Sequence, residues 1–90
     1  MITIGIDAGT SVVKSVAYAA DGTELAVARR PTRVEHPRPG WAEQDMHEVW
    51  DAVADTVAEL TAETGSEVAA LALTAQGDGC WLVDDDGRPT

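Results

Sequence analysis

The chain has 90 residues, with 6 Lys and Arg against 16 Asp and Glu, so its formal charge is −10. Binding to nucleic acid or to an anionic membrane needs clustered basic side chains, so this composition argues against both partners. Apolar residues make up 44% of the chain, which suits one small domain with a modest core. The single Cys80 cannot form an internal disulfide and the N-terminus lacks the features of a signal peptide, so we expect a cytoplasmic protein.

The N-terminal part of the chain predicts three antiparallel strands. Residues 2–7 alternate apolar and polar side chains with the period of a strand, and a turn of small residues follows. Residues 12–20 are expected to form the second strand. Asp21-Gly22 is a strong hairpin signal, which places the third strand at residues 24–30.

A helix is predicted after a proline-rich connection over residues 31–40. Asp45 is a good N-cap, Glu48 completes a capping-box arrangement, and Gly65 is placed to end the helix after about 19 residues. Apolar residues at helical spacing form one stripe, and we expect Trp50 on this stripe to lie in the core. The stripe consists of Met46, Val49, Trp50, Val53, Val57 and Leu60.

The last third of the chain predicts a return to the sheet. Residues 68–74 are almost wholly apolar, which indicates a strand buried on both faces and parallel to the first strand. We expect residues 80–83 to form a further strand and residues 84–87 to form a turn. A single helix leaves one face of such a sheet bare, so we expect the chain to begin a larger protein or to be part of an assembly, with a homo-oligomer left open.

The first turn is a candidate site for a nucleotide. Asp7 ends a predicted strand, where its carboxylate could hold Mg²⁺, and Gly9 allows backbone N–H groups to approach a phosphate. Thr10 and Ser11 add hydroxyl donors, while Lys14 adds a positive charge. The same residues equally suit an ordinary polar hairpin turn.

The segment after the apolar strand is a candidate substrate site. Gln76 can donate and accept hydrogen bonds and Asp78 can accept them, which suits the recognition of hydroxyl groups. We expect Asp7 and Asp78 to open toward one crevice at the carboxyl ends of parallel strands. The alternative is a glycine-rich turn with a solvated Asp78. Trp41 and Trp81 could stack on a sugar or could fill and anchor loops.

Two segments resemble a known family. Ile4-Gly5-Ile6-Asp7-Ala8-Gly9-Thr10-Ser11, with Lys14, resembles the first phosphate motif of the superfamily of sugar kinases, Hsp70 and actin. Pro39-Gly40-Trp41-Ala42-Glu43-Gln44-Asp45, followed by a helix with Trp50, resembles the FGGY carbohydrate kinases. The resemblance implies an α/β, ribonuclease H-like (actin-like ATPase) fold that starts βββαβ as a mixed sheet and is incomplete in this chain. Residues 1–90 would then be the N-terminal part of the first, sugar-binding kinase domain.

The resemblance also implies a function and roles for individual residues. The reaction would be the ATP-dependent phosphorylation of a sugar or polyol with Mg²⁺. Asp7 would organise Mg²⁺, while the nucleotide phosphates would contact Gly9, Thr10, Ser11 and Lys14. Gln76 and Asp78 would contact substrate hydroxyls. The general base of the family lies beyond residue 90, so this segment holds no catalytic base and is expected to be inactive alone.

The resemblance is not complete at the substrate segment. Where this chain has Gly77-Asp78, glycerol kinases have Arg-Glu and xylulokinases have Met-His, which counts against those two exact specificities. Because Asp78 keeps a carboxylate, a polyol such as erythritol or a pentulose is favoured. Two alternatives stay open, an ATPase of the Hsp70 or actin type and a non-catalytic acidic interaction module.

Overall fold

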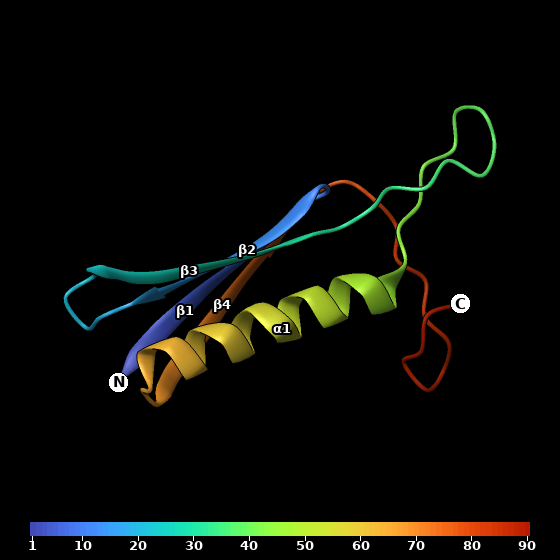
Figure 1. Cartoon of the computed structure of the whole chain (residues 1–90). Helices are drawn as coiled ribbons and strands as arrows, with labels where there is room; N and C mark the ends of the chain where they lie inside the picture. The colour runs from blue at the N-terminus through green and yellow to red at the C-terminus, as the bar shows by residue number, and fades with distance from the viewer.

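The structure is a mixed four-stranded sheet with one helix across one face (Figure 1). The computed structural model describes all 90 residues, 1–90. The elements are β1 (Ile2–Ala8), β2 (Val12–Tyr18), β3 (Glu24–Pro31), α1 (Met46–Thr64) and β4 (Val68–Ala75). The sheet order is β3-β2-β1-β4, with β4 parallel to β1 and the other neighbours antiparallel. This confirms the predicted βββαβ order.

The turn between β2 and β3 confirms the predicted hairpin. The Gly22 N–H donates to the Ala19 carbonyl at 2.9 Å, and Gly22 adopts a φ of 89° that favours glycine. Asp21 Oδ1 accepts the Thr23 N–H at 2.9 Å, and this bonding to Thr23 lowers the pKa of the Asp21 carboxyl. Because this turn begins at Ala19, β2 ends two residues earlier than predicted.

Both ends of α1 lie where the sequence predicts them. Asp45 Oδ1 accepts the His47 N–H at 2.8 Å, and Gly65 ends the helix at a φ of 62° with its N–H on the Thr61 carbonyl at 3.0 Å. The predicted capping box is wrong in one half, because the Glu48 carboxylate bonds to Arg33 instead of to the N–H of Asp45. No helix in the structure combines the length and the apolarity needed to cross a membrane.

The core lies between α1 and the first three strands. Ile4 and Leu60 are fully buried in it, and the helix presents an edge of Ala52, Thr56 and Leu60 to the sheet. Thr56 and Ser15 are also fully buried, and their hydroxyls form a hydrogen bond of 2.8 Å. This bond satisfies polar groups that would otherwise be costly in the core.

The prediction that Trp50 lies in the core is wrong, because 71% of the residue is exposed. Trp50 precedes Ala52 by two residues, which turns it by about 200° around a helix with 3.6 residues per turn. The small Ala52 and the hydroxyl of Thr56 face the sheet instead, where Thr56 meets its partner Ser15. The buried edge of α1 thus includes a residue whose partner, Ser15, lies on the sheet, and helical spacing alone does not reveal such a partner.

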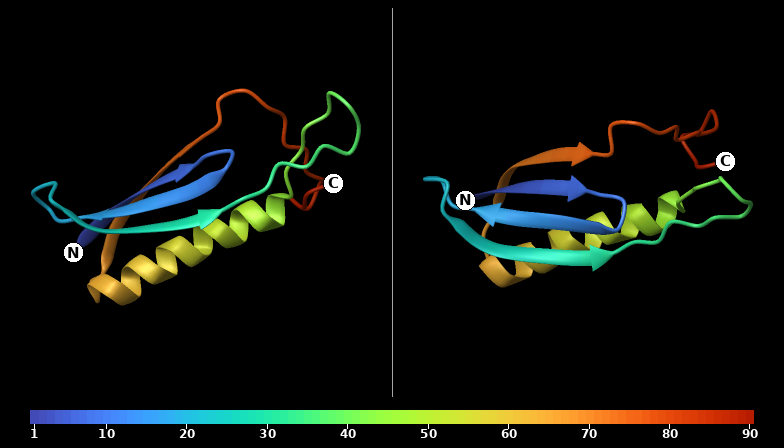
Figure 2. Two further views of the ribbon diagram at one scale, coloured as in Figure 1. Left: turned by 45° about the horizontal axis from the view of Figure 1, so that its top comes forward. Right: turned by 90° about the horizontal axis from the view of Figure 1, so that it is seen from above.

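Strand β4 confirms the predicted pairing but not the predicted burial. It runs parallel to β1, with Leu71 opposite Ile4 and Leu73 opposite Ile6. Paired residues of neighbouring strands share a face, so both leucines lie on the face that carries α1. The helix packs mainly on β2 and β3 and leaves β4 uncovered (Figure 2), so Leu71 and Leu73 are exposed. The expectation of a strand buried on both faces is therefore wrong.

The segment after β4 contains a turn but no strand. Asp84 Oδ1 accepts the N–H groups of Asp86 and Arg88, each at 2.9 Å, which confirms the predicted turn. The predicted strand over residues 80–83 is wrong. Because the turn folds the chain back on itself, Val83 forms an isolated bridge with Pro89 and does not reach the sheet.

Candidate functional site

The turn between β1 and β2 offers free backbone donors. The Gly9 N–H closes the turn on the Val12 carbonyl at 3.1 Å, and a Cβ on Gly9 would lie only 3.0 Å from that oxygen. The N–H groups of Thr10 and Ser11 donate to no acceptor in the protein. The Ser11 side chain is exposed. Successive free N–H groups in a tight turn form a concavity that binds anions, so the turn fits a phosphate.

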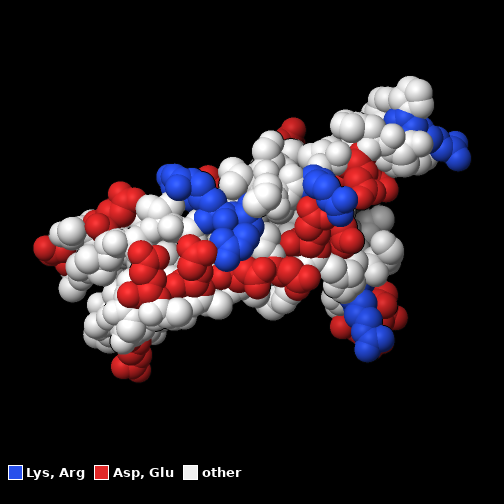
Figure 3. Space-filling view, viewed as in Figure 1, with Lys and Arg blue, Asp and Glu red and all other residues white.

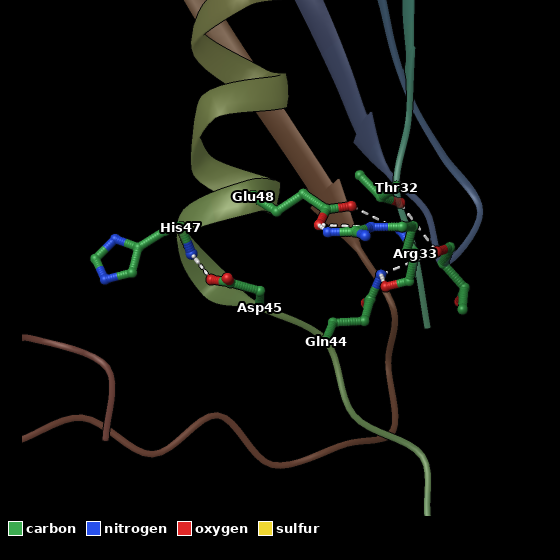
Figure 4. A network of polar contacts seen from close by, with 7 residues as sticks. Thr32, Arg33, Gln44, Asp45, His47 and Glu48 are labelled. Atoms are coloured by element: carbon green, nitrogen blue, oxygen red, sulfur yellow. Dashed lines mark hydrogen bonds and ion pairs between the residues drawn. The ribbon is translucent and has the colours of Figure 1, made fainter. Parts of the chain in front are cut away.

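Thr10 is held from three separate segments. Its carbonyl accepts the Thr32 hydroxyl at 3.0 Å and the Gln44 amide at 2.9 Å. Its own hydroxyl donates to Gln76 Oε1 at 2.9 Å. These bonds connect the turn to the residue after β3, to the residue before the helix cap and to the segment after β4. Figure 4 shows Gln44 reaching from the start of α1 toward this group.

An ion pair between Arg33 and Glu48 lies close to Gln44 along the chain. The Glu48 carboxylate accepts the backbone N–H of Arg33 at 2.8 Å and its guanidinium at 2.9 Å (Figure 4). The guanidinium hydrogen bond lowers the pKa of the Glu48 carboxyl, and the same bond raises the pKa of Arg33. The Arg33 side chain is largely exposed and that of Glu48 is half-buried, so solvent weakens the charge attraction and the main effect of the pair is geometric. It fixes the first turn of α1 against the chain that follows β3.

A hollow of about 330 Å³ opens beside Thr10. Its lining includes Gln44, Gln76, Asp78 and Trp81. Amide and carboxylate groups can hydrogen-bond hydroxyls, and an indole can cover the apolar face of a ring or chain. The lining therefore suits a small polyhydroxy compound. The hollow thus brings Thr10, which we predicted to contact the nucleotide, together with Gln76 and Asp78, which we predicted to contact the substrate.

Trp41, the other tryptophan for which stacking on a sugar was considered, lies elsewhere. Trp41 does not line this hollow, and the Arg38 guanidinium lies 5.0 Å from the centre of its ring. With the bond from the Trp41 N–H to the Arg38 carbonyl at 3.0 Å, this cation–π contact ties Trp41 to its own loop. Trp81 thus stays a candidate for stacking on a substrate, whereas the contacts of Trp41 favour the loop-anchoring alternative.

Asp7 and Lys14 lie on the face of the sheet opposite α1. They are cross-strand partners on β1 and β2, and they line a second hollow with Thr74. Asp78 lines the hollow beside Thr10 and not this one, and the expectation that Asp7 and Asp78 open toward one crevice stays a prediction. The side chains of β1 alternate between faces, and Ile6 takes the core side, which turns Asp7 away from it.

Lys14 is the basic side chain that lines this second hollow, whereas the arginines bound to α1 belong to the other face of the sheet. Two arginines are paired with the helix, Arg30 with Glu59 and Arg33 with Glu48, each at 2.9 Å, and Figure 3 shows basic side chains beside the acidic row along α1. Lys14 forms no such ion pair. No three His, Cys, Asp or Glu residues gather around a metal position. A lone carboxylate suits Mg²⁺, which keeps several waters and binds phosphate oxygens besides.

A comparison with protein families identifies the chain. A sequence model described as the FGGY family of carbohydrate kinases, N-terminal domain, matches residues 2–90. The chain belongs to this family. It is 34% identical over 89 residues to L-xylulose/3-keto-L-gulonate kinase of Escherichia coli (strain K12) and 41% identical over 92 residues to erythritol kinase of Brucella abortus (strain 2308). These alignments cover 96% and 98% of this chain.

Solved structures of the FGGY family show the same fold. The crystal structure of xylulose kinase from Rhodospirillum rubrum superimposes on the whole chain with a TM-score of 0.92 and 32% identity. This confirms the ribonuclease H-like N-terminal domain as the fold class. The chain spans 18% of the length of the two curated relatives and 19% of the Rhodospirillum structure.

Proposed function

We propose that the intact gene product containing this segment transfers the γ-phosphate of ATP to a hydroxyl group of a sugar or polyol. Residues 1–90 would form the N-terminal part of its first, sugar-binding domain, in the cytoplasm. The observation that carries the proposal is the 2.9 Å bond from the Thr10 hydroxyl to Gln76. It joins a turn with free N–H donors to a hollow lined by hydroxyl-binding side chains. Membership of the FGGY family favours this reaction over an Hsp70-type ATPase or a non-catalytic module.

On the nucleotide side, each residue of the turn has a role that its geometry supports. Gly9 permits the tight closure, and the free N–H groups of Thr10 and Ser11 donate to phosphate oxygens. Lys14, which forms no ion pair within the chain, supplies a positive charge, and Asp7 holds Mg²⁺ directly or through water. The ion neutralises charge on the phosphates when bound, and the residues of the turn fix their position.

On the substrate side, Gln76 and Asp78 recognise hydroxyl groups. Gln76 Oε1 is occupied by Thr10, which leaves its amide N–H₂ as a donor, and Asp78 is an acceptor. A four- or five-carbon polyol or ketose is the substrate class that we favour, in line with the erythritol kinase relative. The general base that takes the proton from the attacking hydroxyl lies beyond residue 90.

A coupled ADP-release assay on the intact gene product tests the proposal. With ATP, Mg²⁺ and a panel of polyols and ketoses, we expect ADP release that depends on at least one of them. Asp7→Ala should abolish it, whereas Asp51→Ala, which removes an exposed carboxylate of α1, should not. Near-normal turnover by Asp7→Ala would remove the proposed metal role. If no compound of the panel stimulated ADP release by the wild type, the proposed reaction would be wrong.

A further inference from the structure

We propose that Gln44 is a positioning residue that fixes the Thr10 turn for the nucleotide. The proposal rests on the proposed function in that it takes the turn to be the phosphate site. Gln44 sits immediately before the helix cap Asp45 and is 34 positions from its partner in the chain. Its amide nitrogen donates to the Thr10 carbonyl at 2.9 Å, with a longer second contact of 3.4 Å to the Arg33 carbonyl.

The Thr10 carbonyl is held from two sides. The Thr32 hydroxyl approaches it from the end of β3 at 3.0 Å, and Thr32 is buried. Gln44 approaches it from the start of α1. A carbonyl oxygen has two lone pairs, so these two donors satisfy it fully. Removing Gln44 would leave the carbonyl with a single anchor, on the sheet side.

Anchoring this carbonyl orients a donor of the turn. The Thr10 carbonyl and the Ser11 N–H belong to one peptide group, which is planar and trans. The two bonds therefore hold the Ser11 N–H on the opposite side of that group, where it has no acceptor in the protein. Hydrogen bonds to the carbonyl also polarise the peptide and strengthen the N–H as a donor. The geometry is that of a donor prepared for an anion.

Gln44 can act in this way because its own backbone is fixed. The preceding residue, Glu43, forms an isolated antiparallel bridge with Glu35 through backbone bonds of 2.7 and 2.9 Å. The following residue caps α1, and the Arg33–Glu48 pair holds the first helical turn in place. A fixed backbone limits the positions that the side-chain amide can reach, which favours its bond to the Thr10 carbonyl.

The experiment measures nucleotide binding separately from turnover. The dissociation constant of a non-hydrolysable ATP analogue with Mg²⁺ is measured by calorimetry on the intact gene product and its variants. Gln44→Met keeps the length of the side chain and removes the donor, and Gln44→Glu places a carboxylate against the carbonyl. Glu63→Gln, on an exposed part of α1, is the control for a change between acid and amide.

The Gln44 bond is present without nucleotide, so its typical net worth of ~1 kcal/mol is the upper limit of its effect on binding. We expect Gln44→Met to weaken analogue binding by up to about fivefold. Gln44→Glu should weaken it further, while both variants stay folded at the assay temperature and the binding by Glu63→Gln stays at the wild-type level. Unchanged dissociation constants in both Gln44 variants would overturn the proposal, as would a lowered melting temperature with normal affinity in the folded fraction. Normal analogue binding by a wild type that phosphorylates no compound would instead count against the proposed function alone.

Discussion

Replacing Thr10 by valine tests whether its hydroxyl serves the substrate side of the site. Valine keeps the shape of threonine but cannot donate to Gln76 Oε1, a bond of 2.9 Å between exposed groups. A neutral hydrogen bond of this kind contributes about 0.5–1.5 kcal/mol, which corresponds to about a twofold to tenfold change in rate or affinity. The backbone donors of the turn are unaffected. We therefore expect kcat/KM for the polyol to fall by about that factor and the KM for ATP to change less.

The assay is steady-state ADP release by the intact gene product, with each substrate varied at saturation of the other. Thr10→Ser keeps the hydroxyl and should retain most of the activity. Thr23→Val, in the turn at the other end of β2, controls for a general effect of losing a hydroxyl. If Thr10→Val raised the KM for ATP more than that for the polyol, the hydroxyl would serve the phosphate directly, and its assignment to Gln76 would be refuted.

Three further predictions concern other groups. Asp78→Asn should raise the KM for the polyol about tenfold with little change for ATP, since bonds to charged groups contribute about 1.5–3 kcal/mol; an unchanged substrate profile would favour a solvated turn. Thr56→Val should lower the free energy of unfolding by about 1–3 kcal/mol because the buried Ser15 hydroxyl loses its partner. In urea unfolding the double variant with Ser15→Ala should recover part of this loss, and a purely additive loss would contradict the pairing. The pKa of Glu48 is lowered from an ordinary value of 4.5, so its contribution to stability is present above that pH and is lost as the pH falls through the lowered pKa. The difference in melting temperature between wild type and Glu48→Gln should therefore shrink below pH 4.5, and a difference that grew there would contradict the assignment.

Local sequence signals predicted most of the fold. The ends of α1 follow from Asp45 and Gly65, whose capping bonds involve residues within four positions along the chain. The turn at Asp21-Gly22 likewise depends only on its neighbours. The orientation of Trp50 and the exposure of Leu71 depend instead on which strands α1 covers. That information is tertiary, and helical or strand periodicity does not contain it.

In the candidate site too, local features could be predicted from the sequence and long-range contacts could not. The polar turn at Thr10 and the Gln76 segment were visible in the sequence because short, chemically distinctive residues follow predicted strands. Gln44 was missed because its role is defined by a carbonyl 34 positions away. Two signals were available, its place in the segment that resembles the FGGY kinases and its place directly before the helix cap, but neither points to a partner.

A crystal structure of the intact gene product with Mg²⁺, a non-hydrolysable ATP analogue and a polyol would show where both ligands bind. We expect phosphate oxygens within hydrogen-bond distance of the Thr10 and Ser11 N–H groups and the polyol in the hollow beside Gln76 and Asp78. A triphosphate bound away from this turn, or a polyol held without contact to that hollow, would contradict this expectation.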